Sequence, residues 1–247
     1  MKRDRPVPQW SSIELSVLRA LSIQVKYLTA DQIARGWFAG CDEPESEAAN
    51  LLDSLADSDL IIEETIEVYD APRPARPLMA WRPGEPPPTP GRLNALAETL
   101  ADRWSEHLRP VTVFHGSRNA ANAFGASIAE TRERSSDWSH DLLISEVLLR
   151  YRESRESEVK HWLGESFVPK LGLTIRGMKD PDAFLIVDGR IERVIETGGK
   201  YTVEHLRALH RHCDGGAYRR LQEFASTNGG RQVLRLYDKQ RIPYEIW

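Results

Sequence analysis

The chain has 247 residues, of which 40% are hydrophobic and 28% charged, a composition typical of a globular protein with a buried core. A formal charge of −4 and a pI near 6.0 exclude a general electrostatic attraction to phosphate, so any nucleic-acid contact must come from local basic surface. The sequence has no apolar run of roughly 18 to 20 residues, and Cys41 and Cys213 form no C-x-x-C pair, so we expect a cytoplasmic protein without a membrane span, a disulfide framework or a cysteine zinc site.

The first part of the chain carries the apolar spacing of three helices. Apolar residues recur three or four positions apart between residues 10 and 28, which predicts a helix with one buried face. Thr29 is a favourable N-cap for a second helix over Ala30–Trp37, and a third helix is predicted over residues 45–56. This order is typical of a helix-turn-helix.

Strand patterns follow the three helices. Apolar and β-branched residues at 60–69 and 78–81 predict two strands that can pair as a wing. Three helices and a hairpin indicate a winged-helix-like module over residues 8–83. The prolines between residues 83 and 90 cannot continue a helix or a central strand, so residues 84–110 are expected to be a proline-rich linker and a connecting helix.

The third predicted helix lies in an acidic part of the chain. Between Gly36 and Pro72 there is no lysine or arginine, whereas 11 residues are acidic. A winged helix normally inserts its third helix into the major groove, and an acidic helix would repel the phosphates. We therefore interpret residues 45–56 as a contact for a protein partner or for self-association. Arg73 and Arg76, near the wing, are the alternative route to a DNA backbone.

The remaining sequence mixes helix and strand patterns. A helix is predicted over residues 138–151, and an Asp-Gly turn joins strands over 183–187 and 191–195. A helix over 203–212 follows two glycines. We therefore expect an α/β domain over residues 111–247. Further predicted elements are helices over 92–107 and 120–134 and strands over 111–114, 162–167 and 233–237.

Acidic residues stand at both open ends of the predicted hairpin. Asp182 precedes the first strand, Glu196 ends the second, and Lys200 follows shortly after. Hydrolysis of a phosphodiester needs a hard cation, held by carboxylates, that binds the phosphate and activates water. Asp182 and Glu196 are the predicted metal ligands, Mg²⁺ is the expected ion, and Glu146 can support it from the preceding helix. Lys200 is the candidate for stabilising the developing charge.

This order of residues resembles the PD-(D/E)xK nuclease superfamily. That family's core carries an acidic residue on a helix, an aspartate opening a strand and a glutamate closing the next, which match Glu146, Asp182 and Glu196 here. The resemblance implies a restriction-endonuclease-like fold and metal-dependent DNA cleavage. The family's lysine stands two residues after the glutamate, where this chain has Gly198, and Lys200 lies two residues further on.

A second resemblance covers most of the chain. The order of a helix-turn-helix, His140-Asp141-Leu142 leading a helix, Pro-Asp-Ala at residues 181–183, and Glu196 before a helix is similar to plasmid replication-relaxation proteins. This resemblance implies a plasmid or mobile-element setting.

The geometry of the hairpin allows two arrangements of Asp182 and Glu196. A regular two-residue turn at Asp188 and Gly189 pairs Asp182 with Ile195, which puts Glu196 on the opposite face of the sheet. A three-residue turn or a bulge would place Asp182 and Glu196 on the same face.

Histidines and arginines offer further candidates. His140 is either a residue at a helix start or a general base. His210 and Cys213 are spaced for one helix face but lack a convincing fourth zinc ligand. Arginines near the predicted site form either a solvated face or a surface for a DNA backbone; they are Arg207, Arg211, Arg219 and Arg220.

Together these patterns predict an α+β protein with an N-terminal winged-helix module and a C-terminal restriction-endonuclease-like α/β domain. The leading hypothesis is a DNA-processing protein of a plasmid, phage or defence system, acting as a metal-dependent endonuclease. One alternative is a non-catalytic DNA-binding or regulatory protein that keeps the nuclease fold without its chemistry. Another is an adaptor whose helix-turn-helix binds a protein partner.

Overall fold

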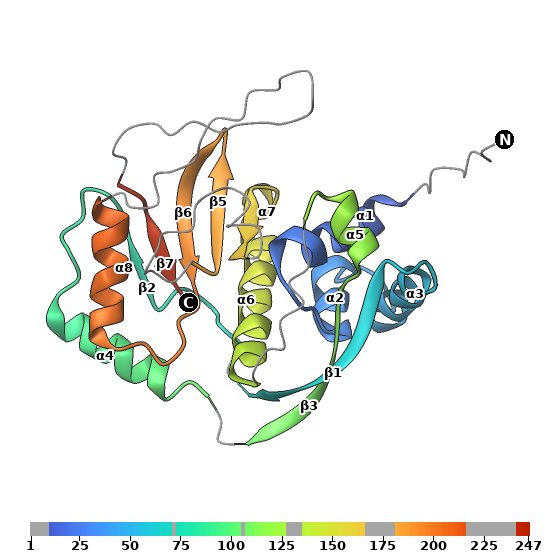
Figure 1. Ribbon diagram of the computed structural model, residues 1–247, viewed down its shortest axis with the longest axis horizontal. Helices are drawn as coiled ribbons and strands as arrows, with labels where there is room; N and C mark the ends of the chain where they lie inside the picture. The colour runs from blue at the N-terminus through green and yellow to red at the C-terminus, as the bar shows by residue number, and fades with distance from the viewer. Residues whose placement is uncertain (1–9, 71–72, 105–106, 127–134, 166–180, 216–240) are drawn as a thin grey trace.

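A computed structural model describes most of the chain: residues 10–70, 73–104, 107–126, 135–165, 181–215 and 241–247. It contains a two-stranded sheet, a five-stranded mixed sheet and helices around both (Figure 1), which confirms the predicted α+β class. None of the helices in the described ranges is long and apolar enough to cross a membrane.

Two of the three α-helices described in the N-terminal part begin at a side-chain cap. Helix α1 (Ser12–Arg19) starts with a capping box, in which the Glu14 amide donates to Ser11 Oγ (3.1 Å) and the Ser11 amide to Glu14 Oε2 (2.6 Å). A π-helical turn, η1 (Ala20–Gln24), continues it, so the predicted helix over 10–28 ends earlier. The other two helices are α2 (Ala30–Trp37), capped by Thr29, and α3 (Pro44–Asp57).

The predicted wing has a different second strand. Strand β1 (Ile61–Tyr69) pairs antiparallel with β3 (Leu108–Gly116), and the other edge of β3 bridges to Leu28. The expected pairing of 60–69 with 78–81 is therefore wrong. The reason is burial: Val113 of β3 is fully buried against the apolar side of β1, whereas β2 (Met79–Trp81) packs in the other sheet.

The five-stranded sheet has the order β2-β7-β6-β5-β4. Only β6 and β7 run parallel. Helices α4 and α8 cover one face, packing on Phe184 and Val194, and α6 covers the other, packing on Ala183 and Ile195 (Figure 1). The bounds are α4 Pro90–Ala101, α5 Arg118–Ala123, α6 Ser135–Ser154, α7 Glu156–Val159, β4 Trp162–Gly164, β5 Ala183–Val187, β6 Arg190–Glu196, α8 Val203–Gly215 and β7 Tyr244–Ile246.

Most of the C-terminal helices and strands lie close to the ranges predicted from the sequence. The helix expected over 92–107 ends at Ala101, and β3 begins at Leu108. The helix expected over 120–134 is described only as α5, and its end lies outside the described residues. The strand expected over 233–237 also lies outside them.

The last strand is held to α6 by a buried carboxylate. Glu245 of β7 accepts hydrogen bonds from the Tyr151 hydroxyl (2.8 Å), from Arg155 (2.9 Å) and from the Trp247 indole (3.0 Å). A buried charge is stable only with such partners. Burial and the charge of Glu245 in turn raise the pKa of the Tyr151 hydroxyl.

One buried apolar cluster joins the two halves of the chain. It contains Leu18 and Ile33 from the N-terminal helices, Val147 and Leu148 from α6, and Ile195 from β6. The N-terminal helices therefore share a core with the five-stranded sheet, and β2, expected in the first module, belongs to that sheet.

Candidate metal centre

A bulge in β6 decides which residues face one another at the open end of the hairpin. Asp188 and Gly189 both have positive φ (49° and 75°), as a two-residue type I′ turn requires. Ile186 pairs with Ile191, but Leu185 pairs with Arg193, so Glu192 is the extra residue. The register shifts by one as a result.

The shifted register brings the two predicted metal ligands together. Ala183 pairs with Ile195, so Asp182 lies across from Glu196. Both carboxylates are buried, each residue being 3% exposed. Of the two outcomes that the sequence left open, the structure has the one in which a bulge places Asp182 and Glu196 together.

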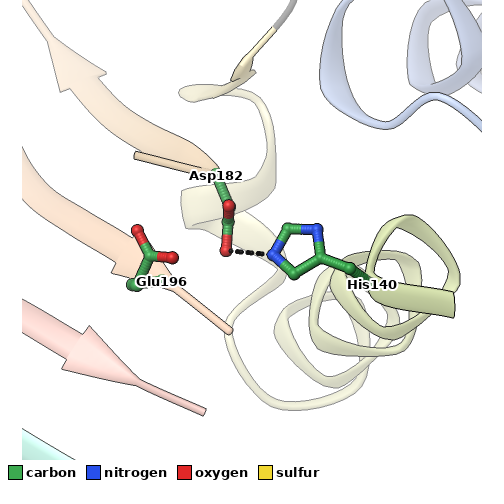
Figure 2. A group of neighbouring side chains, drawn as sticks. All are labelled: His140, Asp182 and Glu196. Atoms are coloured by element: carbon green, nitrogen blue, oxygen red, sulfur yellow. Dashed lines mark hydrogen bonds and ion pairs between the residues drawn. The ribbon is translucent and has the colours of Figure 1, made fainter. Parts of the chain in front are cut away.

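A histidine from α6 completes a group of three. Ligand atoms of His140, Asp182 and Glu196 all lie within 4.8 Å of one another. Figure 2 shows the His140 ring pointing from its helix toward Asp182, with Glu196 beside them on the neighbouring strand. In the described part of the chain this is the one cluster of three such side chains with metal-binding spacing. The sequence indicated His140 only as a helix-start residue or general base.

Hydrogen bonds hold this group in place. His140 Nε2 lies 3.0 Å from Asp182 Oδ2 and 2.8 Å from the Thr197 hydroxyl oxygen. Thr197 donates to the same Asp182 oxygen through its amide (2.6 Å) and its hydroxyl (2.8 Å). The Tyr201 hydroxyl donates to Glu196 Oε1. Sequence reasoning missed Thr197 and Tyr201; the available signal was their place in the segment after Glu196, one and five residues beyond it.

Charged residues surround the group. Arg103 donates to the carbonyl oxygens of Thr197 and Trp247, which fixes the segment after β6. Burial lowers the pKa of Arg103 to about 10, and the negative charge of Asp182 opposes that shift. Arg103 therefore stays protonated at neutral pH. His140 has a carboxylate on the side of its ring away from Asp182: its Nδ1 lies 3.6 Å from Asp141 Oδ1.

Comparisons with protein-family models, curated proteins and solved structures find no match. The chemistry of this centre therefore has to follow from its own side chains.

Glu146 does not join the group. It accepts hydrogen bonds from Gln32 (2.9 Å) and Arg35 (2.6 Å) of α2. Six residues separate it from His140, which puts the two roughly 120° apart around the helix axis. The expectation that Glu146 approaches the carboxylate pair is therefore wrong, and the residue instead ties α6 to α2.

Lys200 is exposed, beyond Gly198 and Gly199 at the end of the hairpin. Its location gives no support for a charge-stabilising role at the three-residue group. Burial raises the pKa of the Cys213 thiol, and the ring of nearby His210 packs edge-on against Trp81 at 4.9 Å. His210 and Cys213 therefore contribute to core packing rather than to the zinc site that their spacing suggested.

The predicted DNA-contacting arginines lie on several surfaces. Arg207 and Arg211 are exposed on α8, where Arg207 also pairs with Glu204 at 3.5 Å. Arg73 pairs with Asp31 at 2.9 Å, and Arg76 is exposed. The remaining two, Arg219 and Arg220, lie outside the described residues.

Proposed function

We propose that this protein is a metal-dependent hydrolase that cuts phosphodiester bonds in DNA. The convergence of His140, Asp182 and Glu196 within 4.8 Å, at the end of a bulged hairpin, carries the proposal. One helix and two strand ends supply these residues, so the arrangement does not arise from sequence neighbours alone.

A cation explains why two buried carboxylates lie together. Two negative charges in a low-dielectric environment repel one another unless a positive charge compensates them. His140 Nε2, Asp182 and Glu196 would be the protein ligands, a set of three that resembles catalytic sites with open positions. A cation there would polarise a phosphoryl oxygen and lower the pKa of a bound water.

The donor set also bears on the metal. Carboxylates suit Mg²⁺ and Mn²⁺, whereas an imidazole suits Zn²⁺ and other transition metals. One imidazole with two carboxylates therefore favours Mn²⁺ or Zn²⁺ over the Mg²⁺ expected from sequence. We propose Mn²⁺ as the first ion to test, with Mg²⁺ and Zn²⁺ beside it.

DNA is the proposed substrate because a helix-turn-helix packs directly against α6, which carries His140. The acidic face of α3 repels phosphates, so the exposed Arg207 and Arg211 on α8, which follows Glu196, support an approach from that side. The exposed acidic residues of α3 remain free for a protein partner or a second copy. The resemblance to plasmid proteins supports a plasmid, phage or defence setting.

One observation favours a second function. Asp182 Oδ2 accepts two hydrogen bonds from Thr197 and lies 3.0 Å from His140 Nε2. A group that is satisfied in this way can be structural. The second candidate is therefore a non-catalytic DNA-binding or regulatory protein.

Metal binding and cleavage decide between these functions. We expect the wild-type protein to bind Mn²⁺ by isothermal titration calorimetry and to cleave DNA only when a divalent ion is present. D182N and E196Q should each weaken Mn²⁺ binding at least tenfold, about 1.4 kcal/mol, and abolish cleavage. EDTA should abolish wild-type cleavage.

The matched control is E98Q, which neutralises an exposed acidic residue on α4. It should bind Mn²⁺ and cleave DNA like the wild type, and circular dichroism should show that all variants are folded. A folded wild-type protein that binds none of Mn²⁺, Zn²⁺ and Mg²⁺ would contradict the hydrolase and support the binding protein.

A further inference from the structure

The His140 ring lies between two carboxylates. Its Nε2 is 3.0 Å from Asp182 Oδ2, on the side of the candidate metal centre, and its Nδ1 is 3.6 Å from Asp141 Oδ1. Asp141 is the next residue of α6, and its side chain is only 4% exposed. A neutral imidazole carries its proton on one nitrogen and binds a metal through the other. A negative charge beside Nδ1 favours the proton there, which leaves Nε2 as the ligand atom.

A lysine from the N-terminal part of the chain holds Asp141. Lys26 follows η1 and lines a small cavity together with His140 and Asp182. Its ammonium lies 3.1 Å from Asp141 Oδ2, whereas the other oxygen, Oδ1, faces the ring. The carboxylate therefore has one oxygen on the lysine and one toward the histidine. These contacts fix its orientation and compensate its buried charge.

The backbone next to Lys26 is fixed to the same helix. The Tyr27 carbonyl accepts a hydrogen bond from the Ser145 hydroxyl of α6 (2.5 Å). The same hydroxyl lies 3.0 Å from the carbonyl oxygen of Asp141, one turn earlier in α6. Lys26 is therefore held at a defined place relative to the turn that carries Asp141 and His140.

The two carboxylates of the candidate metal centre have partners of a different origin. Each accepts from a hydroxyl in the segment after β6: Thr197 donates to Asp182, and Tyr201 donates to Glu196. The contact behind the His140 ring instead joins α6 to the N-terminal part of the chain. The N-terminal part is thus linked to the metal centre through this one ligand.

We propose that Asp141, oriented by Lys26, positions His140 so that Nε2 binds the cation while Nδ1 keeps its proton. This inference rests on the proposed metal centre, but it does not depend on the identity of the substrate. Asp141 and Lys26 act through His140, so both are positioning residues. The N-terminal part of the chain then takes part in metal binding, because it supplies the lysine.

The metal affinity of folded variants tests this role. D141N removes the charge with little change in size, and we expect it to weaken Mn²⁺ binding by about 10- to 100-fold in calorimetry, as loss of a group behind a ligating histidine does. K26M should also weaken Mn²⁺ binding, because the carboxylate loses its orientation. A simple charge effect predicts the opposite sign, since removal of a positive charge near a cation favours its binding. K26R keeps the contact and should recover part of the affinity.

The ring of His140 gives a second readout. Zn²⁺ is a d¹⁰ ion, so the protein bound to it suits NMR. A long-range proton–nitrogen correlation spectrum of the wild type should show the proton of the His140 ring on Nδ1 and the metal on Nε2. Absence of this signal from H140Q assigns it.

E165Q is the matched control. Glu165 Oε2 lies 3.7 Å from the Lys26 ammonium, and 36% of its side chain is exposed. If Lys26 acts through Asp141, E165Q should keep Mn²⁺ affinity within about fivefold of the wild type, the scale of an exposed charge pair. Thermal unfolding without metal identifies any variant that fails to fold, and K26M and K26R carry the comparison if D141N does.

Three results would overturn the role of Asp141 and Lys26. In the first, folded D141N binds Mn²⁺ like the wild type, so that the pair only links α6 to the N-terminal part. In the second, K26M binds Mn²⁺ more tightly than the wild type. In the third, the NMR spectrum places the metal on Nδ1.

Failure of the proposed function gives different results. A wild-type protein that binds none of Mn²⁺, Zn²⁺ and Mg²⁺ contradicts the metal centre, and with it the role of Asp141, before any variant is compared. Cleavage is not among the readouts, so a protein that binds Mn²⁺ but leaves DNA intact contradicts the hydrolase and not the positioning of His140.

Discussion

Single residues at the junction between η1 and β4 set how closely the two halves of the protein approach. Gly164 is the clearest case, because a Cβ there would lie 2.3 Å from the Gln24 carbonyl oxygen. That oxygen is backbone and also accepts the Trp162 hydrogen bond, so it cannot move away cheaply. The same contact places Lys26 beside the metal centre.

We expect Gly164→Ala to lower the free energy of unfolding by about 1 to 3 kcal/mol, because the added methyl group forces the backbone of η1 away from β4. Urea denaturation measures this change. Gly91→Ala in α4 is the control: its Cβ meets nothing within 4 Å, and alanine favours a helix, so the variant should be neutral or more stable by up to about 1 kcal/mol. Equal stability of Gly164→Ala and wild type would show that the junction is not tightly packed.

At the scale of elements, the β5–β6 hairpin shows how one extra residue can assemble a site. Glu192 is exposed and lies outside the ladder, while Arg193 beside it pairs with Glu158 (2.6 Å) and contacts the Tyr151 hydroxyl (3.1 Å). Bulges change the register without disturbing the turn. The convergence of Asp182 and Glu196 follows from this bulge.

Deleting Glu192 should therefore keep the site. The remaining strand would pair without a bulge in the same register, so we expect a folded protein with Mn²⁺ affinity within about tenfold of the wild type, or about 1.4 kcal/mol. Calorimetry and thermal unfolding measure both properties.

Deletion of Arg193 is the matched control. It restores the same register but removes the contacts to Glu158 and Tyr151, so we expect a lower melting temperature than for the Glu192 deletion. If deletion of Glu192 abolished Mn²⁺ binding in a folded protein, the assignment of the bulge would be wrong.

For the molecule as a whole, the shared core joins parts that the sequence separates. Leu18 and Ile33 pack in the same cluster as Val147 and Ile195. Strand β2 lies between β1 and β3 in the sequence but belongs to the five-stranded sheet. Units that share one core cannot unfold independently without exposing it to water.

We therefore expect the full chain to unfold in a single thermal transition, with equal calorimetric and van't Hoff enthalpies. Differential scanning calorimetry measures both. A fragment of residues 73–247 lacks the N-terminal part of the shared core, and we expect it to show no cooperative transition. Two separate transitions of the full chain would mean that the halves are independent domains.

The sequence alone determined the local features of this protein. Helix α2 follows from its Thr29 cap, α3 and α8 follow from apolar spacing, and the hairpin follows from an Asp-Gly turn, because these signals act over a few residues. The pairing of Asp182 with Glu196 was one of two outcomes that the sequence allowed.

Tertiary structure decided the rest. The pairing of β1 with β3, the contacts of Glu146 with α2 and the approach of His140 to the two carboxylates all depend on residues far apart in the chain. Local patterns cannot choose among such partners, since an apolar strand pairs equally well by pattern with several others. The choice is made by burial in a common core, and here that core brings a residue of a helix and two residues of a bulged hairpin to one point.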